Sequence, residues 1–185
     1  MNNNTFTYRI MFKPYGSVRL NILPRVGTIT LDDSGVLTLV DTSAQTVVVQ
    51  KPFGEFLGVR SLNYISNRVY SVILYVGFNE TYEISFGSEN QVLTSGMDMY
   101  EKLLSGDKQG AIEEFKEYNI AQAQPGAVNA AMQQAGDDCA SFITSAKQAG
   151  IYKSSFVPVR SIGNIFAAVV FIAIVLYFAY VFIKR

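Results

Sequence analysis

The feature that most constrains how this chain can fold is a long apolar run near its carboxyl end. Residues 165–183 contain no charge, no amide, no glycine and no proline. At about 1.5 Å of rise per residue, a helix of this length covers the roughly 30 Å of hydrocarbon in a bilayer. Because a helix also satisfies its own backbone in lipid, we predict a transmembrane helix over residues 162–183. The alternative is a buried core helix, which a chain of 185 residues could hardly surround.

The residues around this run predict how the chain is inserted. Residues 1–11 lack the basic-then-apolar order of a secretory signal, so insertion would depend on the 162–183 helix. This is the plan of a tail-anchored, single-pass membrane protein whose N-terminal domain is cytoplasmic. Residues 151–161 would form the stalk. Gly163 and Ala167 make one small-xxx-small step, which indicates packing of the helix against a partner.

Composition argues against several function classes. Fifteen basic and fifteen acidic residues cancel, so no net field favours nucleic acid. The chain has no histidine and a single cysteine, Cys139, which removes imidazole bases, the usual zinc ligands and any intramolecular disulfide. In an Ala-rich helix, a small buried thiol is commoner than a nucleophile. No Gly-rich phosphate loop is present. We therefore expect a protein that is not an enzyme and has no cofactor, metal ion or nucleic-acid partner.

Residues 5–86 read as short strands separated by turn signals, which is typical of a small antiparallel barrel or sandwich. Apolar residues alternate in residues 6–12 and again in residues 18–22, so we predict that these two segments pair. The predicted partners are Phe12 with Val18, Ile10 with Leu20, and Tyr8 with Ile22.

A second hairpin is predicted between residues 69–78 and 81–86, joined by a turn at Asn79 and Glu80. In this register Tyr75 would lie opposite Ile84, and Ile73 opposite Phe86. With the strands between them, the region holds eight candidate strands.

The hydrophobic period changes to that of helices after residue 87. Residues 93–104 would close the sheet domain, and Asp107 is placed to cap a second helix. We assign residues 1–120 to one β-domain with closing helices and 121–126 to a linker. Residues 127–150 form an amphipathic, Ala-rich helix. Its apolar spacing of four and three fits either the seam of a short coiled coil with another chain or a helix folded back on its own domain.

The stretch 27–104 resembles the pleckstrin-homology-like superfold, which includes GRAM domains and related bacterial modules. The likeness lies in the strand 27–31, the turn 32–35, the strand 36–40, and the segment 53–59 that leads into a long hairpin and a helix. It implies a mainly β domain closed by a C-terminal helix.

Pleckstrin-homology domains that bind phosphoinositides resemble one another in a basic signature across their first hairpin. Here Lys13 and Arg19 match it, and Asn21 stands where the signature has an arginine. Arg9 would lie opposite Asn21 in the register above and compensate. The resemblance thus implies a lipid or phosphate site at Arg9, Lys13, Arg19 and Asn21. The alternative is that basic residues on a solvated strand face only protect the sheet from aggregation.

These observations together predict a membrane-tethered, non-catalytic recognition or scaffold protein, or an accessory subunit of a membrane complex. Its partners would be the lipid bilayer and either another protein or copies of itself. The alternative function is binding of anionic phospholipid headgroups through the first hairpin.

Overall fold

The computed structural model describes residues 5–15, 23–65, 68–87 and 90–154. In this part of the chain, seven strands form one antiparallel sheet in the order β4-β3-β2-β1-β7-β6-β5. The strands are β1 (Phe6–Pro14), β2 (Arg25–Leu31), β3 (Val36–Asp41), β4 (Thr46–Pro52), β5 (Gly58–Ile65), β6 (Arg68–Tyr75) and β7 (Thr81–Phe86). A short 3-10 helix, η1 (Phe53–Glu55), joins β4 to β5, and three helices follow the sheet: α1 (Gln91–Ser105), α2 (Lys108–Ala123) and α3 (Ala127–Gln148).

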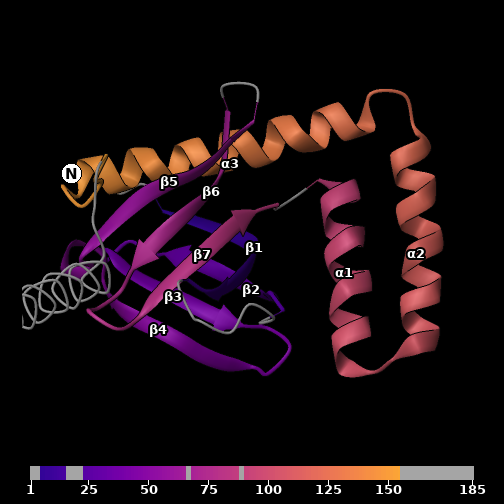
Figure 1. The fold of residues 1–185 in the computed structure, drawn as a ribbon, viewed down its shortest axis with the longest axis horizontal. Helices are drawn as coiled ribbons and strands as arrows, with labels where there is room; N and C mark the ends of the chain where they lie inside the picture. Colours follow the sequence, from indigo (N-terminus) through magenta and orange to yellow (C-terminus); the bar gives the residue numbers. More distant parts are fainter. Residues whose placement is uncertain (1–4, 16–22, 66–67, 88–89, 155–185) are drawn as a thin grey trace, which may run out of the picture. The chain divides into compact units, whose positions relative to one another are not determined.

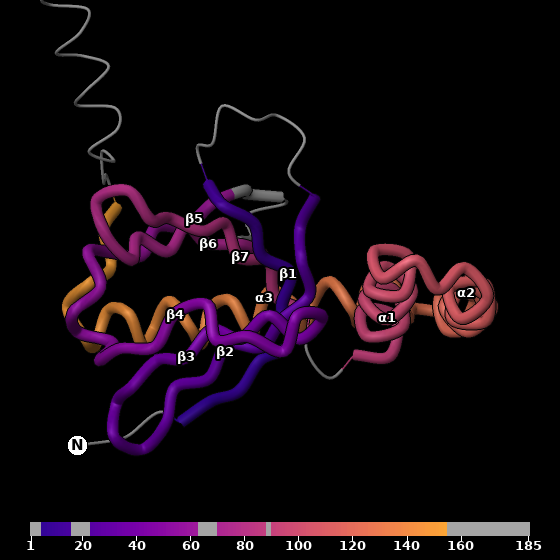
Figure 2. Tube along the Cα trace, turned by 90° about the horizontal axis from the view of Figure 1, so that it is seen from below, coloured from indigo at the N-terminus to yellow at the C-terminus, as the bar shows by residue number. Residues whose placement is uncertain are grey.

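The sheet curls into a half-barrel around α3 (Figure 1). Strand β1 pairs with both β2 and β7 and so joins the two halves of the sheet. Figure 2 shows α3 running between β2, β3 and β4 on one side and β5, β6 and β7 on the other. The predicted mainly β, antiparallel class is therefore confirmed.

Phe142 of α3 lies at the centre of the core and is completely buried. Its ring centroid is 5.6 Å from that of Phe6, 5.6 Å from that of Phe53 and 5.4 Å from that of Phe86. These rings come from the neighbouring central strands β1 and β7 and from the connection after β4. Because aromatic rings bury much area and prefer edge-to-face contacts, this cluster fixes α3 inside the curl.

The predicted pairing of residues 6–12 with residues 18–22 is wrong. Both edges of β1 are already occupied at Ile10 and Phe12: Ile10 lies between Gly27 of β2 and Phe86 of β7, and Phe12 lies between Arg25 and Ile84. Gly27 explains part of this choice: a Cβ there would lie 2.8 Å from the Phe12 ring and 2.2 Å from the Val40 carbonyl oxygen. Only glycine at this position lets the backbone of β2 lie so close to the Phe12 ring of β1 and to the Val40 carbonyl of β3. Residues 16–22, which include Arg19 and Asn21, lie outside the described part.

The predicted hairpin of β6 and β7 exists, but its register differs by three residues. Tyr75 pairs with Thr81 and Val72 pairs with Ile84. The chain does not turn at Asn79 and Glu80 alone, because the Val76 and Gly77 amides both donate to the Glu80 carbonyl and widen the loop. The longer loop shifts the pairing of β6 with β7 by three residues. Because side chains alternate between the two faces of a sheet, an odd shift also changes which residues of the two strands share a face.

Helix α3, rather than the helix that directly follows the sheet, packs in the core of the half-barrel. Helix α2 begins where predicted, since the Asp107 carboxylate accepts a hydrogen bond of 2.9 Å from the Gly110 amide. The Ala-rich helix folds back on its own domain, which was one of its two predicted arrangements. The buried apolar residues of α3 are Ala131, Ala135, Cys139, Phe142, Ile143 and Ala146.

After α3 the chain returns to the sheet. Residues 151–153 run parallel to β5, where the Val59 amide donates to the Ile151 carbonyl and the Lys153 amide donates to the Val59 carbonyl, both at 2.9 Å. The first residues of the predicted stalk are thus part of the folded unit, Met1–Ser154. Among the residues described, no helix has the length and apolar character needed to span a bilayer. The predicted 162–183 helix, with Gly163 and Ala167, lies outside them.

Candidate functional site

Arg9 and Lys13, the two described members of the predicted basic site, lie on the outer face of β1. They alternate with Ile10 and Phe12, which point into the core. Arg9 is bound by two carboxylates of α1: it forms a short ion pair with Asp98, and its Nη2 lies 3.2 Å from Glu101 Oε2. Arg9 therefore holds α1 against the sheet, and its charge is neutralised locally.

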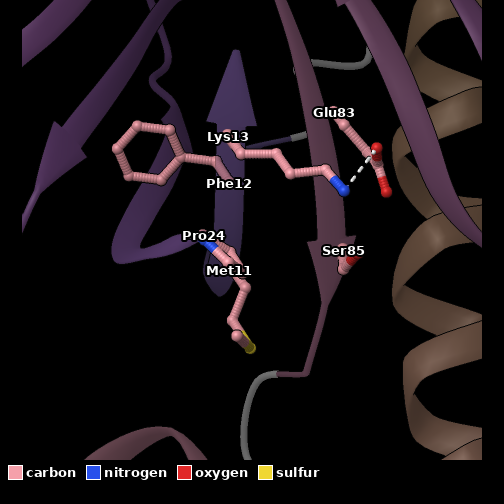
Figure 3. A pocket seen from close by; sticks show the side chains of 6 residues that line it. All are labelled: Met11, Phe12, Lys13, Pro24, Glu83 and Ser85. Atoms are coloured by element: carbon pink, nitrogen blue, oxygen red, sulfur yellow. Dashed lines mark ion pairs between the residues drawn. The ribbon is translucent and has the colours of Figure 1, made fainter. Parts of the chain in front are cut away.

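Lys13 is also paired with an acid. Its Nζ lies 3.1 Å from Glu83 Oε2 on the neighbouring strand β7. Figure 3 shows this pair beside a small hollow of about 80 Å³. The residues that line it are Met11, Phe12, Lys13, Pro24, Glu83 and Ser85. The Glu83 carboxylate at the wall of this hollow would repel a phosphate, so a phosphate would have to displace Glu83 from Lys13.

The structure thus brings Arg9 and Lys13 to one face but gives each an acidic neighbour. Arg19 and Asn21 lie outside the described part, so headgroup binding by these four residues stays a prediction. The sequence did not reveal the acids, because Asp98 and Glu101 lie 89 and 92 residues after Arg9. Their spacing of three on one helix face was the only local signal that they might act together.

A buried carboxylate that sequence reasoning missed lies next to this surface. Asp41, at the end of β3, is completely buried and accepts hydrogen bonds from Arg25, Ser43 and Ala44. Burial alone would raise its pKa, but these hydrogen bonds outweigh burial and leave the pKa of Asp41 below its usual value. These hydrogen bonds hold the turn after β3.

The largest hollow that we describe, about 420 Å³, lies between the start of β1 and the C-terminal half of α3. The rings of Phe6 and Tyr8 are stacked on one wall, with centroids 4.9 Å apart. Small and hydroxyl-bearing residues of α3 form the other wall. The complete lining is Thr5, Phe6, Tyr8, Ala140, Ser141, Thr144 and Ser145, and none of these carries a charge. Such a wall offers contact area and hydroxyl groups, and it holds no carboxylate, imidazole or amine.

Cys139 is completely buried in α3. Desolvation raises the pKa of its thiol to about 12, and the neighbouring Asp138 adds to this effect. We expect the native thiol to react with a disulfide reagent at pH 8 at least a hundredfold more slowly than the unfolded chain, because roughly one thiol in ten thousand would be ionised. A stopped-flow labelling assay with and without denaturant measures this ratio. Equal rates in both states would contradict the burial.

In the described part of the chain, Arg9, Lys13, Arg25 and Lys102 each form an ion pair with a carboxylate. In that part of the chain, no group of three or more His, Cys, Asp or Glu residues is arranged to hold a metal ion. A scan against models of protein families found no match to this chain, and a search of curated proteins found none either.

Proposed function

We propose that this chain is a membrane-tethered, non-catalytic recognition or scaffold protein. The observation that carries the proposal is the short distance along the chain between the folded unit and the apolar run. The unit ends with residues 151–153 on the edge of β5, and the uncharged run begins at residue 165. The intervening chain spans at most about 40 Å. A bilayer holding residues 162–183 would keep the domain, on the cytoplasmic side, within a thin layer.

The pleckstrin-homology-like assignment is supported by the curled, antiparallel, seven-stranded sheet with helices after it. In that superfold a helix closes the sheet, and here α3 occupies the curl after two additional helices. A small β-domain of this kind suits recognition, because its rigid sheet presents edges and loops to a partner.

Among the described strands β4 pairs only with β3, and its outer edge is the contact that we propose for a protein partner. Residues 46–50 on this edge carry no charge, and the Val47 side chain is 59% exposed. Edge strands of this type accept a strand from another chain. The opposite edge, β5, is tied at Val59 by residues 151–153. Confinement near the bilayer would make even a weak edge contact effective.

The proposal is tested by fractionating cells that express the full chain or residues 1–154. We expect the full chain to sediment with membranes and to remain there after an alkaline carbonate wash, because an apolar helix in lipid is not released by charge or pH. Residues 1–154 should stay in the supernatant. Immunoblots of both fractions provide the measurement.

A full chain that is released by carbonate would contradict the tether. The recognition part is tested by purification in mild detergent with wild type and Val47→Lys. A charge on the edge should reduce recovery of a stoichiometric partner or of a second copy. If Val47→Lys recovers the same proteins as wild type, the β4 edge is not the contact.

A further inference from the structure

Helices α1 and α2 form a hairpin that stands beside the sheet (Figures 1 and 2). One side of α2 faces α1: Lys102 Nζ lies 2.8 Å from Glu114 Oε1, and Ala111 and Ala121 are buried. The contact is close enough that a Cβ on Gly96 would lie 3.5 Å from the Tyr118 ring. The face of α2 that packs against α1 is therefore identified.

The outer face of α2 carries Lys108, Ile112, Phe115, Lys116 and Asn119. At 3.6 residues per turn these positions fall within an arc of about 100°, opposite Glu114. Ile112 is 51% exposed and Phe115 is 50% exposed.

This arc contains no acidic residue. The remaining acids of α2, Glu113 and Glu117, fall on the flank beyond it, together with Ile120. Lys108, Ile112 and Lys116 follow one another at intervals of four, so the two ammonium groups bracket an exposed apolar side chain. The outer face is thus amphipathic, and its only charges are positive.

Lys108 and Lys116 also differ from Arg9, Lys13 and Arg25 of the sheet. Arg9, Lys13 and Arg25 each have a carboxylate within 4.0 Å. Among the described residues, no carboxylate lies within that distance of Lys108 or Lys116. Leu103 and Leu104 are likewise exposed at the end of the hairpin, next to the start of α2.

We propose that this outer face of α2 docks on the surface of an anionic bilayer. Ile112 and Phe115 would enter the boundary between headgroups and acyl chains, and Lys108 and Lys116 would extend along it to lipid phosphates or carboxylates. Charge complementarity selects this occupant. A second copy placed symmetrically on the same face would bring lysines against lysines, whereas an anionic surface attracts both.

The proposal is tested by flotation of residues 1–154, a unit that contains the whole described sheet, its helices and its core. Vesicles are made of equal parts of phosphatidylcholine and phosphatidylserine, or of phosphatidylcholine alone. We expect binding to the anionic vesicles only, and weaker binding as salt is raised. Lys108→Glu with Lys116→Glu, and Ile112→Ser with Phe115→Ser, should each reduce the partition coefficient roughly tenfold or more.

Ile120→Ser is the matched control, because Ile120 is an apolar residue of the same helix, 67% exposed, outside the arc. Its partition coefficient should stay within about twofold of wild type, and circular dichroism should show that all variants remain folded. Absence of binding to anionic vesicles would overturn the proposal. So would binding that is lost in Lys13→Glu but unchanged in the α2 variants, which would place the site on β1. A dimer that Ile112→Ser with Phe115→Ser dissociates, without a change in flotation, would assign the face to a second copy.

Because the fragment lacks residues 155–185, this result does not depend on the tether. Failure of flotation and release of the full chain by carbonate are separate outcomes. The first would remove the docking face and the second would remove the membrane anchor.

Discussion

Replacing Phe142 with alanine is expected to lower the free energy of unfolding of residues 1–154 by about 3–5 kcal/mol. The side chain is completely buried, and its ring touches rings from β1, β7 and the connection after β4. Removing it opens a cavity that these rigid neighbours cannot fill, so the cost includes lost burial and the cavity itself. Urea denaturation followed by far-UV circular dichroism measures the change.

The matched control is Phe115→Ala, the same substitution in a different helix. Phe115 is half exposed and lies outside the core, so its loss should change the free energy of unfolding by less than about 0.5–1 kcal/mol. Equal losses for the two variants would mean that α3 does not occupy the curl. Since a drop of this size can exceed half of the stability of a small domain, Phe142→Ala is also expected to lower the yield of soluble protein.

The strand positions could be predicted from sequence because alternation of apolar residues is a local signal. Segments 27–31 and 36–40 were expected as strands, and β2 and β3 contain them. Which strands pair was not predictable in the same way. The pairing of β1 with β7 joins residues that are about seventy positions apart in the sequence, and nothing in the local pattern distinguishes this pairing from a hairpin.

The candidate basic site illustrates the same limit for function. Alternation correctly placed Arg9 and Lys13 on the outer face of β1. Whether their charges are available depends on Asp98, Glu101 and Glu83, which only the tertiary fold brings close. By contrast, the lysines of α2 could be assigned to one face from helical periodicity alone. What the sequence could not show is that no described part of the molecule covers that face.

Replacing Asp41 with alanine is expected to cost about 2–4 kcal/mol of unfolding free energy. The carboxylate accepts hydrogen bonds from the Ser43 hydroxyl at 2.6 Å, the Ser43 amide at 3.1 Å and the Ala44 amide at 3.0 Å, and pairs with Arg25 at 2.9 Å. Its loss removes all of these hydrogen bonds from the turn after β3, each worth about 0.5–1.5 kcal/mol net, while their donors belong to the exposed residues Arg25, Ser43 and Ala44. The ion pair with Arg25 adds little Coulomb energy, because the Arg25 side chain is 61% exposed and its charge is screened by water. Urea denaturation at neutral pH measures it.

Asp41 should also make stability depend on pH. Because folding lowers its pKa, the unfolded chain binds the proton more readily, and the contribution is complete only above the unfolded pKa of about 3.9. As pH falls through the folded pKa, the contribution is lost. Asp41→Asn should therefore flatten the acid limb of the stability curve, whereas Asp137→Ala, at an exposed position of α3, should leave it unchanged. If Asp41→Asn retains the full acid limb of wild type, another carboxylate controls acid unfolding, and the hydrogen bonds around Asp41 stabilise the fold less than the geometry indicates.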